Sequence, residues 1–112
     1  MRELSIVLDA LAELPVDEVI VSGDGSGEAA PVVARHAPWA KLIEQPGPHL
    51  GIAGRNRAAQ AAAGDYLLML DDDAYPLPEA VETLLAAFRS DPRIAVVGGL
   101  VRNVDADGRT LA

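Results

Sequence analysis

Apolar and polar residues alternate along this chain with two spacings, one typical of helices and one typical of buried strands. Helical spacing runs through residues 2–14, where the apolar stripe consists of Leu4, Val7, Leu8, Leu11 and Leu14. Further helices are predicted at 28–35, 55–63 and 79–89. Short runs predict strands at 19–21, 41–44, 66–70 and 94–97. Helices that alternate with short strands indicate an α/β domain with a mostly parallel sheet.

The first predicted helix has one alternative. Residues 5–8, Ser-Ile-Val-Leu, would also suit a short strand. The longer helical stripe continues past them as far as Pro15, which cannot continue a helix, and it therefore favours the helix.

Three aspartates, Asp71, Asp72 and Asp73, directly follow the apolar run at 66–70. An unbroken run of this length predicts a strand buried on both faces, and ligands of open α/β sheets lie at the carboxyl ends of such strands. Adjacent carboxylates repel one another unless a cation compensates. We therefore expect Mg²⁺ or Mn²⁺ here, sharing its oxygen ligands with substrate phosphates. A solvated acidic turn is the alternative.

Composition narrows the class of protein. The chain has 112 residues, half of them apolar, so one domain over residues 1–112 with a real core is expected. A net charge of −8 argues against nucleic acid and anionic membrane surfaces as partners. The absence of cysteine excludes disulfides, thiolate catalysis and Cys-ligated zinc. No apolar run approaches the length of a membrane span and no signal-peptide core is evident, so a cytoplasmic protein is the default expectation.

The loop at 22–27 stands between a predicted strand and a predicted helix, where a dinucleotide-binding glycine loop would lie. Gly23 and Gly25 fit that pattern, but Glu28 occupies the position of the third glycine. A dinucleotide-binding domain is therefore disfavoured. The carboxylate of Asp24 would repel a pyrophosphate and is better suited to accept from a base N–H or a ribose hydroxyl. A plain glycine turn is the alternative.

Three other motifs carry weaker signals. Arg55 and Asn56 open a predicted helix, where positive charge beside a helix N-terminus would meet phosphate, and ordinary surface charge is the alternative. Residues 103–108 resemble the start of a calcium loop, but the bidentate glutamate does not follow, so an Asp-Gly hairpin turn is expected. His49 lies in a predicted loop and is expected at the surface.

Four segments in order resemble the nucleotide-binding half of a family 2 glycosyltransferase with the Rossmann-like GT-A fold. The strand ending in Ser-Gly-Asp-Gly-Ser at 22–26 resembles the family's strand and Asp-Asp-Gly-Ser motif. Residues 50–56 resemble its Asn-x-Gly…Ala-Arg-Asn segment. Residues 63–73 resemble its Gly-(Asp/Glu)-Tyr strand and D-x-D motif, and residues 76–85 resemble the helix that follows. The resemblance covers nearly the whole chain.

The resemblance implies a reaction and a role for each matching residue. The implied reaction is transfer of a sugar from a UDP-, dTDP- or GDP-linked donor to an acceptor, with a divalent metal stabilising the departing diphosphate. Asp24 would contact the base, and Asp73 with Asp71 would hold Mg²⁺ or Mn²⁺. The implied donor-binding residues are Asp24, Arg55, Asn56, Asp71 and Asp72.

The sequence also departs from the family pattern. Gly23 replaces the first acid of Asp-Asp-Gly-Ser, His49 stands where the family often has Asn, and residues 51–56 are one residue short. The family's first strand would precede residue 2, and the acceptor half with the catalytic base would follow Ala112. We therefore expect an incomplete GT-A-like domain that by itself is inactive.

The missing strand would lie between the runs at 19–21 and 66–70. Those two runs would then pair directly with each other, or residues 5–8 would form a strand between them. Otherwise they would pair with another chain through their exposed strand edges or stay loosely packed. Two functions of different classes follow. The first is a glycosyltransferase. In a full-length protein it would be free in the cytoplasm or, as an alternative, peripheral at the inner face of the membrane. The second is a non-catalytic or vestigial nucleotide-binding fragment.

Overall fold

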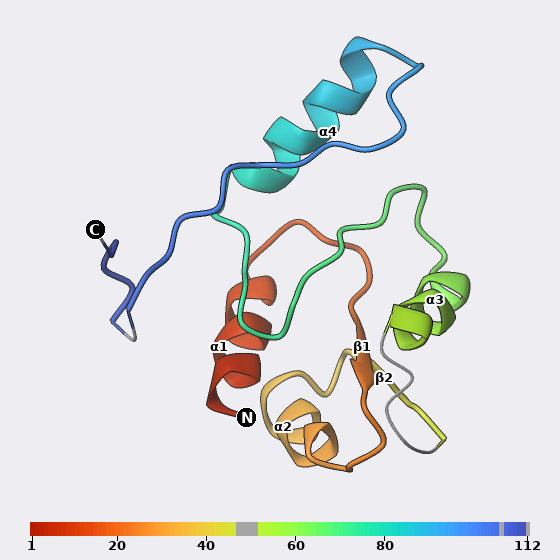
Figure 1. The fold of residues 1–112 in the computed structure, drawn as a ribbon, viewed down its shortest axis with the longest axis vertical. Helices are drawn as coiled ribbons and strands as arrows, with labels where there is room; N and C mark the ends of the chain where they lie inside the picture. Colours follow the sequence, from red (N-terminus) through yellow and green to blue (C-terminus); the bar gives the residue numbers. More distant parts are fainter. Residues whose placement is uncertain (47–51, 106, 112) are drawn as a thin grey trace. The chain divides into compact units, whose positions relative to one another are not determined.

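The computed structural model describes residues 1–46, 52–105 and 107–111, with the exception of the Ile52 side chain. The elements in chain order are α1 (Arg2–Leu11), β1 (Ile20–Gly23), α2 (Ala29–His36), β2 (Lys41–Glu44), α3 (Ile52–Ala61) and α4 (Ala80–Ser90) (Figure 1). The chain divides into two compact units, Met1–Pro76 and Leu77–Ala112.

The first unit contains a parallel sheet of two strands. β1 pairs with β2 in a register that sets Ile20 opposite Lys41 and Gly23 opposite Glu44. Parallel neighbours need a crossover connection, and α2 supplies it. This arrangement confirms the predicted α/β class and the predicted parallel pairing. It also confirms the helix predicted at 28–35, which begins and ends one residue later in the structure, as α2.

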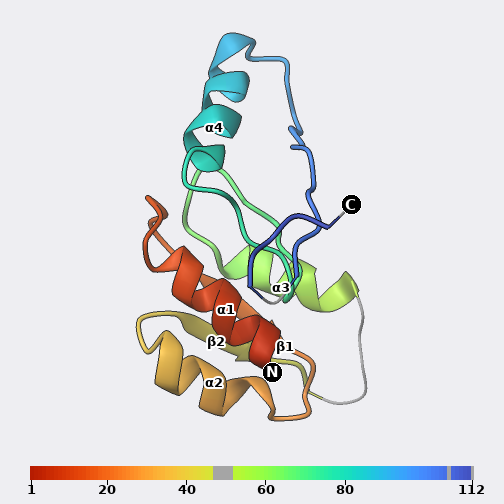
Figure 2. The same cartoon turned by 90° about the vertical axis from the view of Figure 1, so that its left-hand side faces the viewer.

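Helices cover both faces of this sheet. α1 and α2 lie side by side on one face, and α3 packs against β1 from the other (Figures 1 and 2). The first unit is therefore a three-layer α/β/α arrangement, as expected of a parallel sheet, whose faces are usually both covered by helices.

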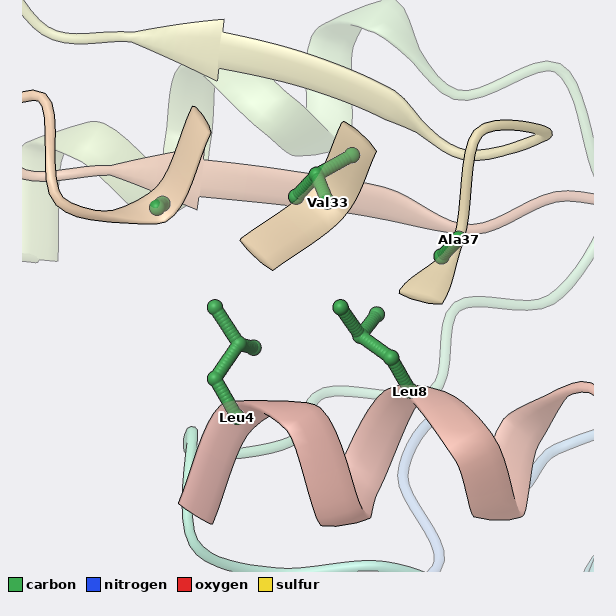
Figure 3. Close-up of a cluster of buried hydrophobic side chains, with 5 residues drawn as sticks. Leu4, Leu8, Val33 and Ala37 are labelled. Atoms are coloured by element: carbon green, nitrogen blue, oxygen red, sulfur yellow. The ribbon is translucent and has the colours of Figure 1, made fainter. Parts of the chain in front are cut away.

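The core lies between α1, α2 and the sheet. Leu4 and Leu8 of α1 point toward Val33 and Ala37 at α2, and Leu8 is only 1% exposed (Figure 3). The buried residues of α1 are four of the five residues of the predicted stripe: Leu4, Val7, Leu8 and Leu11. The helix ends at Leu11 rather than at residue 14, so Leu14 lies beyond it and is partly buried. The helical reading of the N-terminal segment is confirmed, and the alternative strand at residues 5–8 is wrong.

The predicted strand at 66–70 is wrong. These residues have no regular secondary structure, and Tyr66, Leu67, Leu68 and Met69 are 43–53% exposed. A strand exists only through ladder hydrogen bonds to a neighbour. Within the described residues the sheet has two strands, so this run pairs neither with β1 nor with residues 5–8, which are helical. The aspartates that follow therefore do not stand at the end of a sheet strand.

In the second unit the predicted helix at 79–89 is confirmed as α4. Its apolar residues Val81, Leu84, Leu85 and Phe88 are partly buried. After the helix, two hydrogen bonds from the side chain of Arg93 to the Asp91 carboxylate lower the pKa of Asp91 below its usual value.

Two further predictions fall in the second unit. Residues 94–97 form no strand, because no ladder partner faces them in the described part of this unit, and Val96 is almost fully exposed. The predicted hairpin turn is confirmed for the described residues, which leave out residue 106, by an antiparallel bridge between Val104 and Thr110 and by Gly108, whose φ of 82° suits glycine. None of the helices in the described ranges has the length and apolar character needed to cross a membrane.

Candidate functional site

The carboxyl ends of β1 and β2 meet the first turn of α3. The Ser22 hydroxyl donates a hydrogen bond to the Gly54 carbonyl at 3.2 Å. Gly54 is buried, and a Cβ at this position would collide with the amide end of the Gln45 side chain. Glycine at 54 thus lets α3 approach both strand ends closely, which brings Arg55 and Asn56 to this edge of the sheet.

Asp24 lies in the loop between β1 and α2, at the carboxyl end of β1, as predicted. Its Oδ1 accepts a hydrogen bond from the Ser26 amide at 2.9 Å, and the Ser26 hydroxyl accepts one from the Glu28 amide at 3.2 Å. Gly25 and Gly27 have φ values of 90° and 83°, a conformation that other residues rarely adopt. The loop is therefore a defined turn that presents an exposed carboxylate.

Glu44 is a residue of this edge that the sequence analysis missed. It is the last residue of β2, and its Oε2 accepts a hydrogen bond from the Gly25 amide at 3.0 Å. The sequence contains one indication, because Glu44 is an acid at the end of the predicted strand at 41–44. The predicted strand that precedes it in the sequence, at 19–21, runs into the glycine loop. The contact itself depends on the register between β1 and β2, which the sequence pattern does not give.

Arg55 and Asp71, predicted from two separate motifs, form an ion pair in the structure. Nη2 of Arg55 donates to Oδ1 of Asp71, and the two side chains are 50% and 62% exposed. The first turn of α3 is thus joined to the acidic turn as well as to β1. Asn56 follows Arg55 on α3 and is exposed.

The aspartates at 71–73 form an exposed turn in which the Ala74 amide donates to the Asp71 carbonyl at 3.3 Å. Among the described side chains, no group of three or more His, Asp or Glu residues is arranged to hold a metal ion. Mg²⁺ usually binds through one or two carboxylates and takes its other ligands from water and phosphate. Asp71 and Asp73 do not form a complete cage by themselves, so a cation bound there would need further ligands from water or phosphate.

Other parts of the surface bear on the site only by contrast. Two hollows of about 470 and 330 Å³ share Asp17 and Glu18, which precede β1, and the lining of neither includes a predicted donor-binding residue. His49 and the Leu-Gly pair that opens the 50–56 segment lie outside the described residues.

Comparison with known proteins finds relatives that are much longer than this chain. It is 36% identical over 109 residues to the chondroitin synthase of Pasteurella multocida (strain Pm70), which is 92% of this chain and 11% of that protein. The same values hold for the hyaluronan synthase of Pasteurella multocida. The chondroitin synthase of Escherichia coli is 32% identical over 99 residues, 85% of this chain and 14% of that protein.

The chain thus spans 11–14% of the length of these relatives. No solved structure matches it. The model of the family described as Glycosyl transferase family 2 matches residues 3–111, which is nearly the whole chain. Together with the relatives, this match confirms the resemblance seen in the sequence: the chain belongs to glycosyl transferase family 2.

Proposed function

We propose that the carboxyl edge of the β1–β2 sheet, with α3 and the acidic turn, binds the nucleotide-diphosphate sugar of a glycosyl transfer reaction. The observation that carries this proposal is the ion pair between Arg55 and Asp71. It joins two motifs that are separated by 16 residues and that would both have to border one donor pocket. In the same unit, the hydrogen bond between Ser22 and Gly54 ties α3 to the strand that leads to Asp24.

Each residue has a part that its chemistry and position support. The Asp24 carboxylate accepts from an N–H of the base. Asp71 and Asp72 lie near the ribose and diphosphate, and Asn56 borders the pocket. Asp73, with Asp71, holds Mg²⁺ or Mn²⁺. A divalent cation would neutralise charge on the departing diphosphate.

Charge balance explains why the cation and the nucleotide should bind together. The chain carries a net charge of −8, so a diphosphate approaching three exposed aspartates is repelled unless a cation is added. In the structure the Arg55 guanidinium pairs with Asp71 and offsets its charge. With the Asp71 carboxylate bound to a divalent ion, the Arg55 guanidinium would be free to donate to phosphate oxygens.

The alternative is a nucleotide-binding module without catalysis. The specific observation that favours it is that residues 66–70 have no regular secondary structure and residues 66–69 are exposed, so the acidic turn does not follow a sheet strand that would hold it rigidly. Transfer of labelled sugar by the purified chain would exclude the module, whereas nucleotide binding without transfer is expected of the module and equally of a glycosyltransferase domain that is inactive by itself.

A metal titration tests the proposed site. Mn²⁺ binding to the wild-type chain should be tighter with UDP, dTDP or GDP present than without, as measured by calorimetry. Asp73→Ala should weaken Mn²⁺ binding in the presence of the nucleotide by about tenfold or more, because a charged ligand is lost. Asp65→Ala, which removes an exposed acid outside the acidic turn, is the matched control and should bind like wild type. Equal binding by wild type and Asp73→Ala would exclude the metal assignment.

A further inference from the structure

Gly23 and Glu44 form one structural feature. They face each other in the β1–β2 register, and the Glu44 side chain lies across the glycine. A Cβ at position 23 would lie closer than 3.0 Å to Cδ and to both carboxylate oxygens of Glu44. The φ of Gly23 is not positive, so the backbone there does not require glycine. Glycine is present at position 23 because it leaves room for the Glu44 carboxylate.

The Glu44 carboxylate reaches the loop that carries Asp24. Its Oε2 accepts from the amide of Gly25, the residue directly after Asp24. The amide of Ser26, one residue further on, donates to Oδ1 of Asp24 itself. Two successive amides of the loop thus donate to carboxylates. The Gly25 amide donates to Glu44 of β2, and the Ser26 amide donates to Asp24. Glu44 thus holds the backbone amide directly after Asp24.

Stability alone does not account for this arrangement. Oε1 of Glu44 is buried and has no hydrogen-bond partner within the residues the structure describes. A buried carboxylate oxygen without a donor opposes folding. Local arrangements that oppose folding are found mainly where function requires them.

We propose that Glu44 is a positioning residue, which reaches from β2 into the space that Gly23 leaves open and holds Asp24 in the orientation that receives the nucleotide. A carboxylate from the neighbouring strand thereby occupies the region where the family motif has its first acid. This inference rests on the proposed function, because Asp24 is taken to contact the nucleotide.

The geometry offers two independent ways to disturb the contact. Glu44→Ala removes the carboxylate, whereas Gly23→Ala keeps it and displaces it with a methyl group. Glu44→Gln retains an oxygen that can accept from the Gly25 amide, so it is the conservative variant. Glu28→Ala removes an exposed acid at the end of the same loop and is the matched control.

The test is a double-mutant cycle with Asp24→Ala, in which nucleotide affinity is followed by NMR titration with UDP, dTDP and GDP in the presence of Mn²⁺. Glu44→Ala and Gly23→Ala should each weaken binding by about five- to tenfold, the effect of one lost hydrogen bond. Glu44→Gln and Glu28→Ala should stay close to wild type. In the Asp24→Ala background neither Glu44→Ala nor Gly23→Ala should weaken binding further, because the side chain that they position is absent.

Urea unfolding of every variant separates positioning from a purely structural role. An affinity loss that persists undiminished in the Asp24→Ala background would overturn the proposal, as would unchanged affinity in both Glu44→Ala and Gly23→Ala. If Glu44→Ala fails to fold, Gly23→Ala alone decides between these outcomes. A wild-type chain that binds none of the three nucleotides would overturn the proposed function and this inference with it. Binding by wild type with no effect of either variant would overturn the inference alone.

Discussion

At the scale of single residues, contacts at the candidate site matter more for the charge that a ligand would meet than for the free energy of folding. The Arg55–Asp71 pair is the clearest case, since both side chains are at least half exposed. Exposed ion pairs typically contribute about 0–1 kcal/mol to stability and are weakened by salt. The guanidinium nevertheless contacts Asp71, the first of the three aspartates at which the proposed diphosphate would bind.

Replacing Arg55 should therefore separate binding from stability. Arg55→Ala is expected to lower the free energy of unfolding by less than about 1 kcal/mol while weakening UDP binding by about tenfold or more, because a charge-assisted hydrogen bond to phosphate is lost. Urea unfolding and calorimetry measure the two quantities. Arg57→Ala, on the same helix and also exposed, is the control. Equal loss of affinity in the two variants would mean that only the overall charge of α3 matters.

Residue types and spacing were enough to predict where in the fold some residues of the candidate site lie. Asp24 was predicted to lie in a loop after a strand, and Arg55 at the start of a helix, because glycines and apolar runs mark such boundaries in the sequence. Glu44 was missed because its importance depends on which residue faces it across the sheet. Register between parallel strands is a tertiary property, and no local pattern around Glu44 encodes it.

At the scale of elements, the helices were predicted well and the strands only in part. The stripe of α1 specifies its own helix, because helical hydrogen bonds form within one segment. The runs at 66–70 and 94–97 are as apolar as a buried strand, yet neither is one. An apolar run indicates a tendency to be buried, whereas a strand also requires a partner with free ladder groups. β1 and β2 have such partners in each other.

The packing of α1 on α2 can be tested at its centre. Leu8 is 1% exposed and contacts the α2 side of the core, so Leu8→Ala should destabilise the first unit by about 2–5 kcal/mol through lost burial and a residual cavity. Ile6 lies on the opposite side of the same helix and is 38% exposed. Ile6→Ala should therefore cost much less. Urea unfolding followed by circular dichroism measures both, and similar losses would show that α1 does not pack in the way described.

At the scale of the whole molecule, the first unit leaves a continuous apolar segment uncovered. Tyr66, Leu67, Leu68 and Met69 are consecutive, and each is about half exposed. In the described residues β1 has a strand neighbour on one edge, which is β2. Exposed apolar segments and unpaired strand edges are the features through which chains associate.

We therefore expect the purified chain to self-associate as its concentration rises, through residues 66–69. Sedimentation velocity over a wide range of concentrations measures this. Leu67→Lys and Met69→Lys place charge in the segment and should shift the chain toward the monomer, because a buried lysine would oppose pairing. Ile6→Lys, which adds the same charge at another exposed apolar position of the first unit, should leave the association unchanged. A chain that stays monomeric at every concentration, or one that all three substitutions affect equally, would show that residues 66–69 are not the contact surface.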